Sequence, residues 1–153
     1  MRIIVGDPDP KHIAYVNQIL GILKHQMVGS AGDATATLTI GRQLTPDVAI
    51  VYAHFTDLRL GRVVQSLLQN TYAKAVIIGT KMPITEIELI NTLPNTTIVM
   101  RPFTVQKMAE AIAAVTGTPV PIARPVAPAA SAPQPVAAAP KPASPFARPS
   151  FVR

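Results

Sequence analysis

The sequence contains neither cysteine nor tryptophan. Without cysteine the chain can form no disulfide, no thiolate zinc site and no iron–sulfur cluster, and it has no cysteine nucleophile. Three histidines remain as soft ligands, but His12, His25 and His54 are 13 and 29 residues apart, which is not the i, i+4 spacing of a helical metal site. The sequence therefore predicts no metal site and no cofactor.

Long hydrophobic runs are also missing. Although 48% of the residues are hydrophobic, no run approaches the roughly 18 uninterrupted apolar residues of a membrane-spanning helix. The N-terminal segment MRIIVGDPDP becomes acidic at once and lacks the basic and apolar regions of a secretory signal. We therefore expect a soluble, cytoplasmic protein with no membrane span.

Acidic side chains are confined to the first three quarters of the chain. Residues 1–117 carry ten basic and all eight acidic side chains, a balance of +2, whereas residues 118–153 carry four basic side chains and no acid. Four dispersed cations do not form the clustered basic surface of a nucleic-acid-binding protein. The charge pattern therefore does not favour nucleic acid as a partner.

The composition changes sharply after Gly117. Ten of the sixteen prolines lie beyond it, and most of the residues between them are alanine. Proline fixes φ and removes a backbone donor, and alanine offers little surface to bury, so this segment cannot offset its ordering entropy by forming a core. We predict a domain over residues 1–117 and an extended, disordered tail over residues 118–153 that acts as a tether.

The end of this tail, SPFARPSFVR, has a different pattern. Phe146 and Phe151 alternate with Arg148 and Arg153, which fits a short docking peptide. The alternative is a plain linker that leads to a further domain.

Residues 1–117 alternate between apolar strand-like runs and helical periodicity, which indicates an α/β sheet. Strands are predicted over residues 3–5, 27–31, 48–52, 75–79 and 97–100. Helices are predicted after Asp9 and Pro10, over residues 34–44, around residues 63–68, at the Thr85–Glu88 capping box and around residues 105–112. Strict alternation predicts a doubly wound, five-stranded parallel sheet with its functional residues at the carboxyl ends of the strands.

Four segments at those positions resemble, in order, motifs of the receiver domain of bacterial two-component response regulators. RIIVGDPDP is similar to the first receiver strand and its acidic turn, PDVAIVY to the third strand, AVIIGT to the fourth, and RPF to the lysine–proline–phenylalanine motif after the fifth. The resemblance covers residues 1 to about 117 and implies a flavodoxin-like fold with strand order 2-1-3-4-5.

The resemblance also implies a degenerate phosphorylation pocket. Receivers accept phosphate on an aspartate that ends the third strand, and that aspartate and an acid of the first turn hold a divalent metal. Here Tyr52 stands at the acceptor position and Pro8 at the second acid, whereas Asp7 matches the first acid. Because a neutral phenol can neither form an acyl phosphate nor replace a carboxylate as a ligand, we expect neither metal binding nor phosphorylation by the family's route.

Three further residues belong to this pocket. Asp9 is close to Asp7 but is expected to cap the first helix. Thr80 matches the hydroxyl that follows the phosphate in receivers, and Arg101 stands where the family has a lysine. A structural role also fits Arg101, since an arginine beside Asp7 would neutralise a partly buried carboxylate.

No enzymatic motif is present. The sequence contains no GxGxxG after the first strand, no Walker sequence and no GxSxG. His54 and Asp57 share a loop with Tyr52 and could form an acid–base group, but such loop side chains are ordinarily solvated. We predict that the protein is not an enzyme.

The leading functional hypothesis is a pseudo-receiver, a phosphorylation-independent protein-interaction or scaffolding module that tethers a partner through its flexible tail. In receivers the fourth helix, fifth strand and fifth helix form the common partner and dimer face, so a protein partner or a homodimer is expected there. The candidate contact residues are Ile84, Ile87 and Val105 on this face and Phe146, Arg148 and Phe151 in the tail.

A second hypothesis comes from another class of protein. Atypical receivers also resemble the N-terminal domains of pilus-assembly ATPases related to the MinD and ParA families. Under this hypothesis the chain is the localising or regulatory part of such an ATPase, or its free-standing relative.

Overall fold

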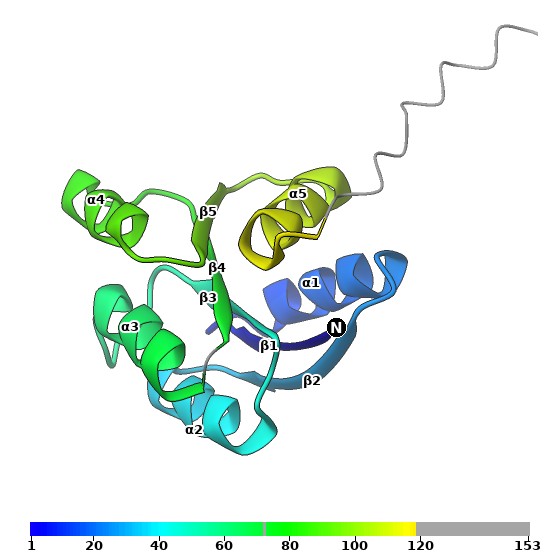
Figure 1. The fold of residues 1–153 in the computed structure, drawn as a ribbon, viewed down its shortest axis with the longest axis horizontal. Coiled ribbons are helices and arrows are strands. Elements are labelled where there is room, and N and C mark those ends of the chain that lie inside the picture. Colours follow the sequence, from blue (N-terminus) through cyan, green and yellow to red (C-terminus); the bar gives the residue numbers. More distant parts are fainter. Residues whose placement is uncertain (72, 119–153) are drawn as a thin grey trace, which may run out of the picture. The chain divides into compact units, whose positions relative to one another are not determined.

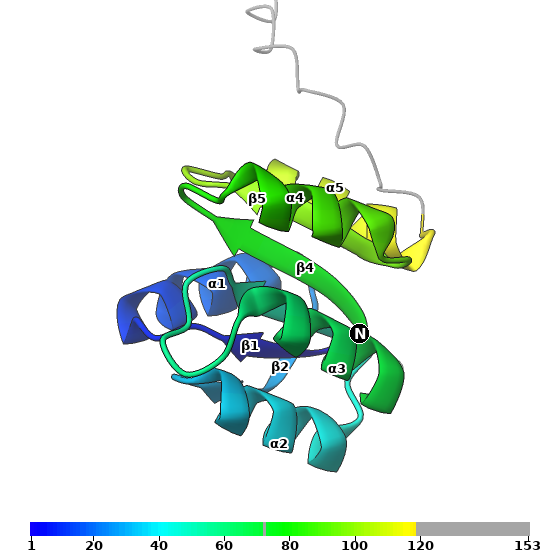
Figure 2. The same cartoon turned by 90° about the vertical axis from the view of Figure 1, so that its left-hand side faces the viewer.

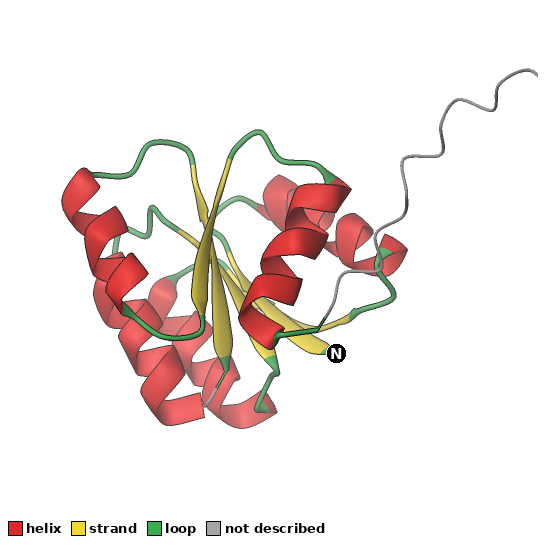
Figure 3. Cartoon of the chain, turned by 45° about the horizontal axis from the view of Figure 1, so that its top comes forward, coloured by secondary structure: helices red, strands yellow, loops and turns green. Residues whose placement is uncertain are grey.

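A five-stranded parallel sheet lies between two layers of helices in the computed structural model, which describes residues 1–71 and 73–118 (Figures 1 and 3). The strand order is β2-β1-β3-β4-β5, which confirms the predicted fold. The strands are β1 (Arg2–Gly6), β2 (Gln26–Ala31), β3 (Val48–Tyr52), β4 (Lys74–Gly79) and β5 (Thr96–Met100).

Five helices connect the strands and cover both faces of the sheet. The helices are α1 (Pro10–Ile22), α2 (Ala34–Leu44), α3 (Leu60–Thr71), α4 (Ile84–Thr92) and α5 (Val105–Thr116). Helices α1 and α5 pack on one face, and α2, α3 and α4 pack on the other, as the view onto the second face shows (Figure 2). No helix in the described part of the chain has both the length and the apolar character needed to cross a membrane.

Both faces of the central strands are buried, and this explains their nearly continuous apolar sequences. Ile3 and Val5 of β1 face the core formed with α1 and α5, whereas Ile4 between them faces the core formed with α2 and α3. Successive side chains of a strand point to opposite faces. One strand therefore contributes to two cores and holds both helical layers in place.

Two of the predicted helix starts are confirmed. The Asp9 carboxylate accepts a hydrogen bond from the Lys11 N–H (2.9 Å), and the Asp33 carboxylate accepts one from the Ala36 N–H (2.6 Å). Each carboxylate satisfies an N–H group that the first helical turn leaves without a partner.

The predicted capping box at the fourth helix is wrong. Helix α4 follows Pro83, which makes no side-chain cap, and it begins at Ile84. Thr85 therefore lies inside the first turn, where its backbone is helical, and it cannot serve as the cap whose side chain Glu88 would complement.

The predicted tail, residues 118–153, lies outside the described residues except for Thr118. The candidate docking residues Phe146, Arg148 and Phe151 lie outside them as well.

Candidate functional site

Asp7 is the buried acid at the carboxyl end of the sheet. It follows β1 directly, its residue is only 2% exposed, and its Oδ1 accepts a hydrogen bond from the Asp9 N–H at 2.8 Å. Burial raises the pKa of the Asp7 carboxyl, because the charged form loses its hydration. The Asp9 N–H and the nearby His12 and Arg101 act in the opposite direction without cancelling the effect of burial.

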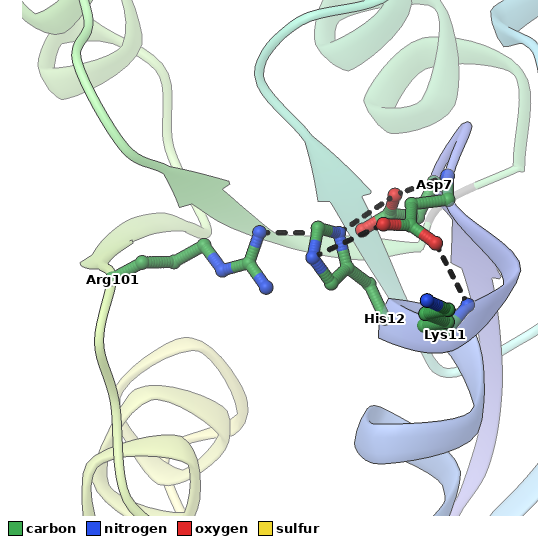
Figure 4. A network of polar contacts seen from close by, with 5 residues as sticks. Asp7, Lys11, His12 and Arg101 are labelled. Atoms are coloured by element: carbon green, nitrogen blue, oxygen red, sulfur yellow. Dashed lines mark hydrogen bonds and ion pairs between the residues drawn. The ribbon is translucent and has the colours of Figure 1, made fainter.

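His12 lies at the centre of a polar network that links this acid to the far side of the pocket (Figure 4). Its Nδ1 is 3.4 Å from Asp7 Oδ1, and its Nε2 is 3.4 Å from Asp9 Oδ2. Arg101 extends from the end of β5, and its Nη1 approaches the same Nδ1 atom at 3.1 Å (Figure 4). The imidazole therefore stands between two carboxylates and one guanidinium.

This arrangement corrects the expectation that Arg101 neutralises Asp7 by direct contact. Among the described residues the ion pairs of Asp7 include His12 but not Arg101. The reason is steric and local. The His12 side chain, on the first turn of α1, occupies the space between the two groups and takes the hydrogen bond that Arg101 offers.

Sequence reasoning considered His12 only as a metal ligand and missed its structural position. One signal was available. His12 lies three residues after the helix cap Asp9, and residues three apart lie on one face of a helix. That spacing brings the His12 ring back over the turn that carries Asp7 and Asp9.

Tyr52 ends β3 and faces the same network. The Arg101 guanidinium carbon is 5.9 Å from the centroid of the Tyr52 ring, a cation–π distance. The His12 ring lies 6.0 Å away, and the His54 ring approaches edge-on at 5.5 Å. The body of the half-buried Tyr52 side chain packs on the core beneath α1 and α5. At the acceptor position the chain thus places a packed aromatic ring under a guanidinium.

Thr80 lies at the same edge of the sheet but outside this network. It is exposed, and it lines a cavity of about 380 Å³ together with Tyr15, Arg101, Pro102 and Phe103. The Tyr15 hydroxyl donates to the Phe103 carbonyl oxygen at 3.1 Å and so ties α1 to the loop before α5. Of the five predicted pocket residues, Asp7, Asp9, Tyr52 and Arg101 converge on His12, and Thr80 does not.

His54 and Asp57 do not form an acid–base pair. The Asp57 carboxylate accepts the N–H groups of Ala34 and Thr35 and the Thr35 hydroxyl, at 2.9 to 3.1 Å. Partial desolvation raises the pKa of Asp57, but these hydrogen bonds outweigh it and lower the pKa below its ordinary value. Asp57 therefore acts as a second cap that fixes the β3–α3 loop to the start of α2.

The carboxylates at the pocket are those of Asp7 and Asp9, and both face the His12 ring. Across residues 1–71 and 73–118, no group of three or more histidine, aspartate or glutamate side chains could hold a metal ion.

The candidate partner residues of α4 and α5 differ in exposure. Ile84, at the start of α4, is 73% exposed, whereas Ile87 and Val105 are half-buried and Val105 packs against the core. Sequence reasoning did not single out Leu89 and Met100, which are 49% and 46% exposed. In this part of the fold the exposed apolar side chains therefore belong to α4 and the end of β5.

A shallow cavity accompanies this surface. It has a volume of about 400 Å³ and lies between β5 and α5. Thr97 and Met100 line it on the strand side, and Lys107, Ala111 and Ala114 line it on the helix side.

No protein-family model matches this sequence, and no curated protein sequence matches it either. Solved structures do match the fold. A response regulator receiver domain protein from Clostridium thermocellum is 18% identical with a TM-score of 0.68, and the match covers 76% of this chain and 94% of that chain. A CheY-like receiver domain protein from Methanospirillum hungatei is 14% identical with a TM-score of 0.68 and the same coverage.

The response regulator domain of CheB from Thermotoga maritima is also similar, with 14% identity, a TM-score of 0.67, and coverage of 78% of this chain and 98% of that chain. These matches span nearly the whole of each receiver domain at low sequence identity. The described part of this chain therefore has the fold of response regulator receiver domains.

Proposed function

We propose that this domain is a receiver-type protein-interaction module that works without phosphorylation. It presents a surface to a protein partner, and residues 118–153 serve as a tether. The observation that carries the proposal is the His12–Arg101 contact of 3.1 Å in the pocket where a receiver would bind its metal and phosphate.

The first step of the argument concerns the acceptor. Formation of an acyl phosphate requires a carboxylate nucleophile. The Tyr52 side chain at this position is a phenol packed on the core, with Arg101 over its ring. The Tyr52 ring packs against neighbouring side chains and offers no carboxylate oxygen for phosphoryl transfer.

The second step concerns charge. A buried carboxylate such as Asp7 is costly unless hydrogen bonds or positive charge accompany it. In this pocket the Asp9 N–H, the His12 ring and the more distant Arg101 guanidinium surround it. The chain's own side chains thus offset part of the cost of this buried carboxylate, a role that an external cation has in a receiver.

The third step concerns the surface. Ile84 exposes 73% of its surface at the start of α4, and Met100 exposes 46% at the end of β5. Exposed apolar groups that cluster on one face commonly mark interaction sites. We assign the partner contact to this face, and we include the half-buried Ile87 and Val105 in it.

The test is affinity capture from the native cell extract with the full chain and two matched variants. Ile84→Glu places a charge on the proposed face, whereas Ile22→Glu places one at the end of α1, where the side chain is also well exposed (65%). We expect Ile84→Glu to lose proteins that the wild type and Ile22→Glu both retain. If all three baits retain the same proteins, the face has no such role.

A shorter chain that ends at Gly117 separates the domain from the tail. Retention of the same partner by this chain would identify the tail as a spacer. Loss of the partner would transfer the binding role to Phe146, Arg148 and Phe151, and would contradict binding by the α4–β5–α5 face alone.

A further inference from the structure

We infer that His12 is a proton-controlled switch for Arg101. When neutral, His12 accepts a hydrogen bond from Arg101, and when protonated, it turns both ring N–H groups to Asp7 and Asp9 and releases Arg101. This inference rests on the proposed function, because it describes how a pocket that is not phosphorylated could still respond to protonation.

The geometry at one ring atom carries the inference. His12 Nδ1 is 3.1 Å from Arg101 Nη1 and 3.4 Å from Asp7 Oδ1. A guanidinium only donates hydrogen bonds, and an ionised carboxylate only accepts them. A single ring nitrogen can satisfy the first group only without a proton and the second only with one. The two contacts are therefore alternatives.

The Arg101 contact requires a ring whose Nδ1 carries no proton. With the proton on Nε2, that atom can donate toward Asp9 Oδ2 at 3.4 Å, and the lone pair on Nδ1 can accept from Arg101 at 3.1 Å. The shorter of the two Nδ1 contacts is thus the one that the neutral tautomer allows.

Protonation reverses this preference. Both ring nitrogens then carry hydrogens, each next to a carboxylate oxygen, and Arg101 faces a second cation. The charged and titratable groups around the ring come from three segments: Asp7 and Asp9 in the turn before α1 with Lys11 after them, Tyr52 at the end of β3 with His54 behind it, and Arg101 after β5. Figure 4 shows Asp7, Lys11 and Arg101 around His12.

A proton gained or lost at His12 Nδ1 therefore exchanges one contact for the other.

The position of Arg101 links its contact with His12 to the loop between β5 and α5. Arg101 begins the loop that leads into α5, and it lines the 380 Å³ cavity with Thr80 and Phe103. Tyr15 holds Phe103 through its hydroxyl. When Arg101 leaves His12, the loop between β5 and α5 loses one of its two polar links to α1.

The experiment is an NMR titration of the full chain from about pH 8 to pH 5. The ring nitrogens of the histidines and the side-chain Nε–H of Arg101 are followed together. We expect the Arg101 signal to shift with the same midpoint as His12. The shift should be lost in His12→Gln, which keeps an oxygen acceptor for Arg101 but cannot titrate.

His54→Gln is the matched control, because it removes a second histidine that contacts the same Tyr52 ring. It should leave the Arg101 titration unchanged. An Arg101 signal that stays constant while His12 titrates in the wild type overturns the inference, and so does a shift that persists in His12→Gln. The wild-type titration decides the question even if His12→Gln does not fold.

No partner is needed for this readout. A constant Arg101 signal would therefore remove the switch and leave the proposed interaction face intact. Conversely, a failed capture with the wild-type chain would count against the proposed function and would not affect the titration.

Discussion

The guanidinium of Arg101 reaches the imidazole of His12 at 3.1 Å, although 89 residues separate the two along the chain. Parallel strands bring their carboxyl ends to one edge of the sheet, and this edge is where ligands usually bind in such folds. Here the two side chains meet each other across that edge, next to the buried carboxyl of Asp7. The pocket is thus occupied by contacts within the chain.

Asp7→Asn is expected to raise the free energy of unfolding at neutral pH. Because the pKa of folded Asp7 is raised, its protonated form favours folding; this contribution is complete below the unfolded-state pKa and is lost as the pH rises through the folded-state pKa. Asparagine stays neutral and keeps an oxygen that can accept the Asp9 N–H. The gain in stability should therefore shrink as the pH falls.

Urea denaturation at neutral and acidic pH measures this effect. Asp47→Asn is the control, because Asp47 also accepts one backbone N–H, that of Arg2, but is exposed. It should show no comparable gain. A loss of stability in Asp7→Asn at neutral pH would mean that His12 and Arg101 favour the ionised carboxyl more strongly than burial opposes it.

Gly6→Ala is expected to destabilise the domain by about 1–3 kcal/mol, the usual range for overpacking a core. A Cβ atom at Gly6 would lie 2.5 Å from Thr37 Oγ1 and 3.1 Å from Phe55 Cζ, so α2 or the loop after β3 would have to move. Thr37 cannot turn away freely, because its hydroxyl donates to the Asp33 carbonyl at 2.6 Å.

Gly21→Ala provides the opposite expectation. A Cβ at this position of α1 meets nothing within 4 Å, and alanine in a helix is favoured over glycine by about 0.5–1 kcal/mol. Thermal unfolding should therefore show a lower Tm for Gly6→Ala and an equal or higher Tm for Gly21→Ala. Equal Tm values for Gly6→Ala and the wild type would contradict the close approach of α2 to β1.

The fold could be predicted because its signals are local and repeated. Helix α2 and strand β3 lie at the residues that the sequence predicts, Ala34–Leu44 and Val48–Tyr52. A cap marks the first, and an apolar run marks the second. The fourth helix shows the limit of such local reasoning, since the Thr85–Glu88 pattern was present but the helix began at Ile84, two residues before the start that a Thr85 cap implies.

The site was predictable only in part. Asp7, Tyr52 and Arg101 could be grouped because each follows or ends a parallel strand. The role of His12 could not be found in the same way, because it depends on where the Arg101 side chain reaches after the whole sheet has formed. A contact between the first helix and the loop after β5 has no local signature in the sequence.

Asp33→Ala should cost about 1 kcal/mol of stability, within the usual range of 0.5–2 kcal/mol for an N-cap. The Asp33 carboxylate accepts the Ala36 N–H at 2.6 Å, and alanine would leave that donor without its partner. Thr85→Ala is the matched control, since Thr85 is exposed and lies within the first turn of α4 without capping it. Its effect should stay within about 0.5 kcal/mol. Chemical denaturation of both variants would show whether the corrected start of α4 holds.

Tyr52→Asp should not make the domain accept phosphate from a small-molecule phosphodonor with Mg²⁺. The substitution supplies the missing carboxylate nucleophile, but Pro8 still offers no ligand at the turn after β1, and Asp7 and Asp9 remain next to His12. Intact-mass measurement after incubation should show no phosphoryl adduct on the wild type or on this variant.

The informative comparison is Tyr52→Asp with and without Pro8→Asp. If both acids are needed, labelling should appear in the double variant alone, provided that the added carboxylates can compete with His12 for the cation. Labelling of Tyr52→Asp by itself would show that the remaining acids suffice to hold the metal, and it would contradict the view that the His12–Arg101 contact has replaced the external cation. In that case the loss of phosphorylation would rest on residue 52 alone.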